Sequence, residues 1–220
     1  MLLYYITDRK AFPGSEQEQR KALLGKIGEA ARAGIDLIQL REKDLTAREL
    51  EGLAGEAVRA VRDNSAATKL LINSRTDIAL ACHADGVHLP AGDLPASEVR
   101  ALWMKCSNCQ PVIGVSAHSV NDVRLAHSHG ADFVVIAPIF EKIQSSERPL
   151  GVDALRTACS ELRGSGSFPV LALGGVTLKN AGACVAAGAS GVAGIRLFQT
   201  GTLHDTVQRL RALEAREIAR

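Results

Sequence analysis

The stretch His129-Gly-Ala-Asp-Phe-Val-Val-Ile-Ala-Pro138 decides the fold, because it joins the end of a helix to the start of a strand. Gly130 follows a segment of helical periodicity and is suited to the left-handed conformation that closes a helix. The apolar run that begins at Phe133 is continuous rather than alternating, which is typical of a parallel strand covered on both faces. Similar joints occur at Gly34 and Gly188, so the sequence contains a weak repeat of helix, glycine and strand.

Apolar runs of strand length recur eight times along the chain, separated by segments of helical periodicity. They cover residues 4–7, 37–40, 69–73, 86–89, 112–116, 133–138, 170–173 and 191–195. Eight units in 220 residues average about 28 residues each, close to a minimal strand-plus-helix unit. The pattern predicts an α/β fold, a single (β/α)8 TIM barrel forming one domain over residues 1–220. An open doubly wound sheet is the structural alternative.

The composition excludes several classes of protein. Apolar residues make up 46% of the chain and charged residues 23%, which is enough to bury a core and too apolar for an extended disordered segment. The 26 basic residues nearly balance the 24 acidic ones and aromatic residues make up only 4%, so no nucleic acid partner is expected. Because no stretch approaches about 18 uninterrupted apolar residues, we expect no membrane partner and a cytoplasmic location.

The five cysteines are an odd number in a chain too large to need disulfide bonds for stability, so a disulfide framework is not expected. Cys106 and Cys109 form an isolated CxxC pair. A zinc site would need further ligands at matching spacing, and the sequence offers none. We interpret the pair as a surface turn before a strand.

In a barrel of this kind the active site lies at the C-terminal ends of the strands, so the residues after each apolar run are candidates for function. Gln39, Arg41 and Lys43 alternate after the second run, which lets all three side chains point to one side of an extended segment. Two cations and an amide at the barrel mouth suit an anionic, phosphorylated ligand. The alternative is a solvated loop in which Arg41 pairs with Glu42 or Asp44.

Three polar residues lie in or just after the third and fourth runs: Asn73 ends the third run, His88 lies in the fourth, and Asp93 follows it. Asp93 is a candidate magnesium ligand beside a diphosphate, or else it caps a helix that begins near Pro95. His88 falls inside a strand, where a hydrogen-bonded core histidine is the more common arrangement than a ligand contact.

Ser116 ends the fifth run and His118 follows it, so both lie at the C-terminal lip of the predicted barrel. Histidine acts as a general acid or base near neutral pH, and serine can donate a hydrogen bond to a phosphate or a ring nitrogen. After the sixth run, residues 141–150 form a polar segment without helical periodicity, which is typical of a lid or ligand loop.

A phosphate site is predicted where the seventh and eighth runs end. Gly174 and Gly175 let backbone N–H groups approach an anion, while Ile195 and Arg196 follow the eighth run. Phosphate held by the loops after strands seven and eight is a recurring feature of TIM barrels.

Taken together, these residues resemble the thiamine phosphate synthase family, which includes the TenI-type thiazole tautomerases. The resemblance rests on an ordered set of short motifs: Tyr5-Ile-Thr-Asp8, Gln39-Leu-Arg-Glu-Lys-Asp44, Ile72-Asn73, Asp85-Gly-Val-His88, Gly114-Val-Ser-Ala-His118, Ala131-Asp-Phe133, Leu173-Gly-Gly-Val176 and Gly191-Val-Ala193. In a synthase, hydroxymethylpyrimidine diphosphate loses its diphosphate with the help of magnesium, and the nitrogen of a thiazole phosphate captures the resulting cation.

The resemblance implies a role for each candidate residue. Gln39, Arg41, Lys43 and Asn73 would hold the pyrimidine diphosphate, Asp93 a Mg²⁺ ion, and Ser116 the departing group. Backbone around Gly175 and Ile195 would hold the thiazole phosphate. In the tautomerases, which need no metal, the histidine matching His118 is associated with proton transfer.

Two departures from the synthase pattern shift the expectation slightly toward the tautomerase. Ser74 stands where synthases have a second magnesium carboxylate, and the segment after Phe140 lacks their Thr-x-Thr-Lys, which raises the question whether Lys142 replaces that lysine. Tautomerase chemistry is therefore the first expectation, synthase chemistry the second, and a catalytically silent phosphate-binding regulator the third. The expected partners are a small phosphorylated thiazole, a pyrimidine diphosphate if the chain is a synthase, and a second copy in a homo-oligomer.

Overall fold

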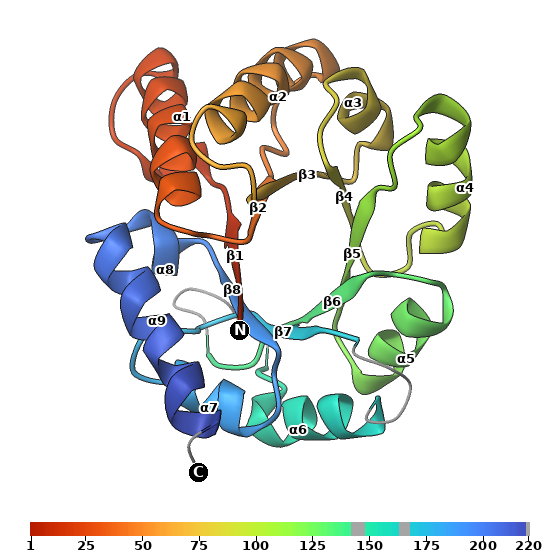
Figure 1. The fold of residues 1–220 in the computed structure, drawn as a ribbon, viewed down its shortest axis with the longest axis vertical. Coiled ribbons are helices and arrows are strands. Elements are labelled where there is room, and N and C mark those ends of the chain that lie inside the picture. The colour runs from red at the N-terminus through yellow and green to blue at the C-terminus, as the bar shows by residue number, and fades with distance from the viewer. Residues whose placement is uncertain (142–147, 163–167, 219–220) are drawn as a thin grey trace.

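The structure is a computed structural model that describes residues 1–141, 148–162 and 168–218. Eight parallel strands pair in sequence order and close on themselves, because β1 also pairs with β8. Helices surround the strands, and the view down the barrel in Figure 1 shows this ring. The predicted (β/α)8 TIM barrel is confirmed, and the open doubly wound sheet is wrong.

The strands are β1 Leu2–Ile6, β2 Leu37–Leu40, β3 Lys69–Asn73, β4 Gly86–Leu89, β5 Val112–Ala117, β6 Phe133–Ile136, β7 Val170–Ala172 and β8 Gly191–Gly194. The helices are η1 Arg9–Ala11, α1 Glu16–Arg32, α2 Ala47–Arg62, α3 Thr76–Ala81, α4 Ala96–Cys106, α5 Val120–Ser128, α6 Gly151–Glu161, α7 Ala181–Ala186, α8 Arg196–Gln199 and α9 Leu203–Ile218. Each observed strand overlaps a predicted apolar run, and β2, β3 and β4 have the predicted bounds.

The helix ends follow from local sequence. Thr46 and Glu49 form a reciprocal capping box at the start of α2, and the Ser119 hydroxyl accepts a hydrogen bond from the Asp122 amide at the start of α5. The glycines of the three predicted joints all have positive φ, namely +85° at Gly34, +76° at Gly130 and +98° at Gly188. Each helix thus ends where the next strand must begin.

The interior of the barrel is filled with side chains rather than open. Tyr4, Leu37, Leu71, Phe133 and Leu171 belong to one buried apolar cluster contributed by alternating positions of the strands. The ring of Phe133 occupies the space beside Gly114, where an added Cβ would lie 2.2 Å from its Cζ atom. This packing closes the N-terminal end of the barrel and leaves polar side chains for the C-terminal end.

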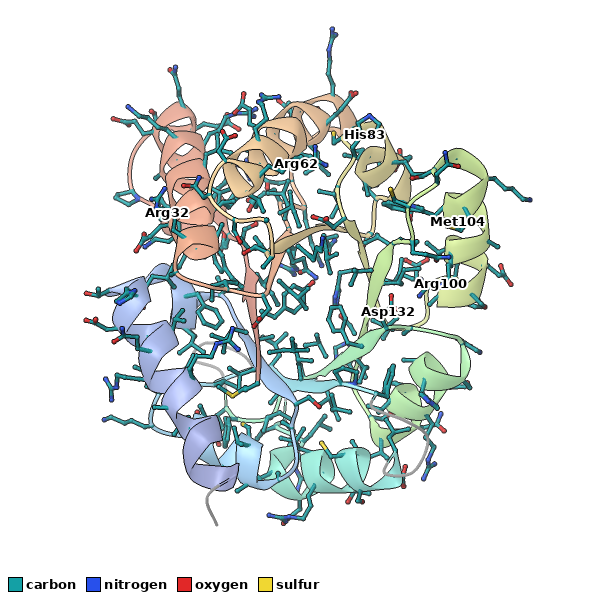
Figure 2. The ribbon with its side chains drawn as sticks, in the orientation of Figure 1. Arg32, Arg62, His83, Arg100, Met104 and Asp132 are labelled. Atoms are coloured by element: carbon teal, nitrogen blue, oxygen red, sulfur yellow. The ribbon has the colours of Figure 1, made fainter. Side chains whose placement is uncertain are left out.

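Aspartates fasten alternate strand pairs at the N-terminal end. Asp36, Asp85 and Asp132 immediately precede β2, β4 and β6, and each accepts a hydrogen bond from the second amide of the preceding strand, at Leu3, Leu70 and Ile113. Each aspartate also pairs with a cation. Arg100 lies 2.9 Å from Asp132, for example, and Figure 2 labels both residues. Ser190 precedes β8 in the corresponding place, and within the described residues its hydroxyl makes no such bond.

In the part of the chain that the structure describes, no helix is long and apolar enough to cross a membrane.

Candidate active site

Two of the four consecutive charges in the segment after β2 are paired within the protein. Arg9 lies between Glu42 and Asp44, with its Nη1 atom 3.3 Å from Glu42 Oε2 and 2.6 Å from Asp44 Oδ1. Arg41 and Lys43, the alternate residues, form no ion pair with any described residue. The interpretation in which Arg41 pairs with Glu42 or Asp44 is therefore wrong, and two cations remain available at the barrel mouth.

This ion cluster is held by the first strand. Thr7 donates a hydrogen bond to Glu42 at 2.6 Å and accepts one from the Arg41 amide at 2.9 Å, so β1 orients the segment after β2. Burial raises the pKa of the Glu42 carboxyl, and the hydrogen bonds from Thr7 and Arg9 oppose that effect. Hydrogen bonds from Arg9 and Lys10 hold the pKa of Asp44 well below its usual range.

A chain of hydrogen bonds crosses the barrel interior below these cations. Gln39 Nε2 lies 3.1 Å from the Tyr4 hydroxyl, which lies 3.1 Å from His88 Nδ1. His88 Nε2 lies 2.9 Å from Ser116 Oγ. Burial, and then the charge of Arg41, lower the pKa of His88 from 6.5 to about 3, so the ring is neutral at physiological pH. His88 is thus the hydrogen-bonded core histidine that the sequence favours, and Ser116 stands at the end of the chain.

The end of β3 has an unusual backbone. Asn73 is half-buried, and its Nδ2 donates to Ser74 Oγ at 3.0 Å. Ser74 has a φ of +61°, in the left-handed region, and its amide donates to the carbonyl oxygen of His88. Ser74 therefore occupies a strained position beside Asn73.

Asp93 does not cap α4. The residue before that helix is Pro95, with no side-chain cap, and among the described residues the exposed Asp93 carboxylate accepts only from the Leu94 amide, at 2.8 Å. The capping interpretation is wrong, and most of the carboxylate's hydrogen-bonding capacity is unused. Among the described residues, no group of three or more histidine, cysteine or acidic side chains could hold a metal ion.

His118 is exposed at the C-terminal end of β5 with a fixed ring. Its Nδ1 lies 3.1 Å from the carbonyl oxygen of Ala137, which can only accept, so Nδ1 carries the proton of the neutral ring. Nε2 then presents a lone pair and has no partner among the described residues. That arrangement suits a general base.

The loops after β7 and β8 enclose a cavity of about 770 Å³. The four predicted phosphate residues, Gly174, Gly175, Ile195 and Arg196, all line it. Gly174 and Gly175 have φ values of +91° and +66°, and an added Cβ at Gly175 would lie 2.5 Å from the carbonyl oxygen of Glu141. Only glycine fits this close approach.

Sequence reasoning missed three residues around this cavity. Asn180 holds the turn that leaves β7, because its Oδ1 accepts from the Thr177 amide at 2.7 Å and its Nδ2 donates to the Gly175 carbonyl at 2.9 Å. Lys179 and Arg209 add cations to the same lining. The Thr-x-x-Asn spacing signals the turn, whereas nothing local signals Arg209, which comes from α9.

Two other predictions concern residues that take no part in the contacts described above. Lys142 and most of the predicted lid or ligand loop lie outside the described residues. Cys106 and Cys109 are exposed thiols at the end of α4 and in the turn before β5, as the surface-turn interpretation expects.

Comparison with known proteins gives a consistent result. Residues 3–198 match the thiamine monophosphate synthase family. A protein of Aquifex aeolicus (strain VF5), named provisionally as thiamine-phosphate synthase 2, is 41% identical over 197 residues, covering 89% of this chain and 96% of the relative. The thiamine-phosphate synthase of Chlorobium luteolum (strain DSM 273) is 36% identical over 194 residues, covering 87% of this chain and 82% of the relative.

A solved structure extends the likeness to three dimensions. Thiamine phosphate pyrophosphorylase from Pyrococcus furiosus superposes with a TM-score of 0.78 at 26% identity. The match covers 98% of this chain and 96% of that one.

Proposed function

This chain belongs to the thiamine monophosphate synthase family, and from that premise we propose that it joins hydroxymethylpyrimidine diphosphate to a thiazole phosphate and releases diphosphate. The names of its relatives support the synthase over the tautomerase, which the sequence alone placed first. One observation carries the proposal. Arg41 and Lys43 stand unpaired at the barrel mouth, with respect to the described residues, while Arg9 engages the acids beside them.

In the proposed reaction, the bond between the pyrimidine methylene carbon and the diphosphate oxygen breaks, and its electron pair leaves with the diphosphate. The lone pair of the thiazole nitrogen then forms the new carbon–nitrogen bond. Arg41 and Lys43 stabilise the negative charge that develops on the leaving oxygens, which is the largest demand of this chemistry. Gln39 and Asn73 position the pyrimidine part, and Ser116 donates to the departing group.

The cavity formed by the loops after β7 and β8 is the proposed site of the thiazole phosphate. Backbone N–H groups around Gly174, Gly175 and Ile195 would donate to its oxygens, and Arg196 adds a cation at the rim. Leu173 and Ala193 line the same cavity and lead toward the barrel axis, where the ring would meet the pyrimidine cation.

Asp93 is the proposed ligand of Mg²⁺. One exposed carboxylate fits this ion when substrate phosphates complete its shell, since Mg²⁺ is commonly bound by one or two carboxylates plus phosphate oxygens. When bound, Mg²⁺ would neutralise diphosphate charge. Because Ser74 supplies no carboxylate, we expect little affinity for the ion without a diphosphate ligand.

A direct assay tests the proposal. Purified protein is incubated with thiazole phosphate and hydroxymethylpyrimidine diphosphate, with and without magnesium, and thiamine phosphate is measured. Formation of thiamine phosphate that depends on magnesium is the expected result. If both ligands bind but no product forms under saturating conditions, the synthase proposal is wrong, and the phosphate-binding regulator takes its place.

The geometry of His118 favours thiazole tautomerase chemistry as a second candidate. Its Nε2 lone pair is open at the barrel mouth, and a tautomerase would use it to move a proton on a thiazole carboxylate phosphate. A tautomerase would lose about 10²- to 10⁴-fold in turnover with His118→Gln. Full tautomerase activity in that variant would remove this candidate.

We also infer a cytoplasmic location and a single domain. Exposed Cys106 and Cys109 are unbonded thiols, as in a reducing compartment, and the barrel strands run from Leu2 to Gly194 without interruption by another unit.

A further inference from the structure

Ser116 is the outer end of a buried hydrogen-bond chain that begins at Gln39. Tyr4 is fully buried, Gln39 is 2% exposed and His88 is 3% exposed. The links are Gln39 Nε2 to Tyr4 at 3.1 Å, Tyr4 to His88 Nδ1 at 3.1 Å, and His88 Nε2 to Ser116 Oγ at 2.9 Å. A chain of groups that can both donate and accept has a direction, and each link fixes the next.

The first link sets that direction. The Gln39 amide nitrogen can only donate, so the Tyr4 oxygen accepts from it. The Tyr4 hydroxyl hydrogen then has one acceptor in reach among the described residues, His88 Nδ1. If Nδ1 carried a proton instead, the buried Tyr4 hydrogen would have no acceptor. His88 therefore carries its proton on Nε2.

The last link follows from the tautomer. His88 Nε2–H donates to Ser116 Oγ, so that oxygen serves as an acceptor inside the barrel and its own hydrogen is left for a ligand. If the hydrogen bonds ran in the opposite direction, the Gln39 amide would have to be rotated. Ser116 would then present its lone pairs to the ligand, which is unfavourable for an anion. The low pKa of His88 keeps the ring neutral, as an acceptor from Tyr4 must be.

We propose that Tyr4 is a positioning residue which, through His88, makes Ser116 a dedicated hydrogen-bond donor to an acceptor atom of the ligand. With the synthase function proposed above, on which this last contact rests, the acceptor is an oxygen of the departing diphosphate. The site then selects ligands that present an oxyanion or an unprotonated nitrogen to Ser116 and disfavours those that present an N–H or O–H group there.

Nitrogen NMR of histidine-labelled protein without ligand tests the direction of the chain. The expected spectrum at neutral pH shows His88 with a proton-bearing Nε2 and a bare Nδ1, and Tyr4→Phe shifts the ring toward a mixture of tautomers. A wild-type His88 protonated on Nδ1 would overturn the proposal. This readout needs no substrate, so it stands even if the synthase assay fails.

Kinetics with a matched control test the consequence. Tyr4→Phe keeps the ring and removes the hydroxyl, and we expect turnover to fall about five- to tenfold with little change in KM for the thiazole phosphate. Tyr5→Phe is the control, because the Tyr5 hydroxyl is also buried but has no hydrogen-bond partner among the described residues. Ser116→Ala should lower turnover at least as much as Tyr4→Phe. Equal turnover in the Tyr4 and Tyr5 variants would contradict the positioning role.

Discussion

Among single residues, the sequence Arg41-Glu-Lys-Asp44 shows which charges are paired within the protein. Glu42 and Asp44 both pair with Arg9, whereas Arg41 and Lys43 form no ion pair with any described residue. The predicted extended segment is not what the structure shows, because β2 ends at Leu40 and residues 43–44 form a turn. The four consecutive charges still do not neutralise one another, because Arg9 pairs with both acids. The cost of holding two like charges at the mouth is offset when an anion binds.

Removing either cation should impair the proposed reaction more than it impairs folding. We expect Arg41→Gln and Lys43→Gln each to lower turnover about 10²- to 10³-fold, because a donor to the developing charge is lost. Thiamine phosphate formation and the urea midpoint are measured for each variant. Arg48→Gln, an exposed arginine on α2, is the control. Equal losses in all three variants would argue against a leaving-group role.

His88 should make the protein less stable in acid. Its folded pKa of about 3 lies below the unfolded value of 6.5, so between these limits the unfolded chain binds a proton that the folded chain does not. The free energy of unfolding therefore falls as pH drops through that window, by up to about 1.4 kcal/mol per pH unit. Urea unfolding at several pH values should show a shallower pH slope for His88→Gln. The same slope in both proteins would mean that His88 titrates normally in the fold.

At the scale of elements, the turn after β7 is the most constrained part of the site. Gly175 combines a φ of +66° with a close approach to Glu141, while Asn180 bonds both sides of the turn. The backbone N–H groups of Gly174 and Gly175 belong to this turn, so their placement depends on its conformation rather than on side-chain rotamers.

Gly175→Ala should weaken thiazole phosphate binding about tenfold or more, because the new methyl group would displace either the turn or the backbone at Glu141. Titration calorimetry with thiazole phosphate measures the effect. Gly34→Ala is the matched control. Gly34 also has a positive φ, but no heavy atom lies within 4 Å of a Cβ added there. Gly34→Ala should cost stability without affecting binding; similar affinity in both variants would remove the turn from the phosphate site.

Strands could be predicted from the sequence because fully covered parallel strands are unbroken apolar runs, and glycine joints mark their starts. The four predicted phosphate residues could be expected to lie together, as they do around one cavity, because a strand end fixes where its next residues lie. The partner of Glu42 could not be placed, since Arg9 is 33 residues away and the two meet only through the pairing of β1 with β2. The role of Asp93 stayed ambiguous because Asp-Leu-Pro fits a helix start that α4 does not use.

At the scale of the whole molecule, Arg211 connects the two ends of the chain. From α9 it donates to the carbonyl oxygens of Met1 and Gly34 and pairs with Asp36 at 2.8 Å, while Asp36 also binds the Leu3 amide at 2.7 Å. Figure 1 shows α9 on the same side of the barrel as β1 and β8. Helix α9 thus holds the N-terminal ends of β1 and β2 in place.

Arg211→Met should lower the free energy of unfolding by about 1–3 kcal/mol, because two backbone carbonyl oxygens and a carboxylate lose their donor. Chemical denaturation measures the loss. Arg209→Met on the same helix should change stability by less than about 0.5 kcal/mol, because Arg209 is exposed and forms no ion pair with a described residue. An equal loss for both would mean that Arg211 contributes only as a solvated charge.

Aspartates join β1 to β2, β3 to β4 and β5 to β6, but a serine stands in the corresponding place before β8. Strand β7 also has only three residues. We therefore expect hydrogen exchange to reveal β7 and β8 as the first strands to open locally, with bound thiazole phosphate slowing their exchange most. Uniform exchange around the barrel would contradict this. The cavity proposed for the thiazole phosphate is formed by the loops after these two strands. If the ligand binds there, substrate binding and barrel closure are linked equilibria, and the substrate supplies a contact between β7 and β8 that an aspartate supplies at the other three pairs.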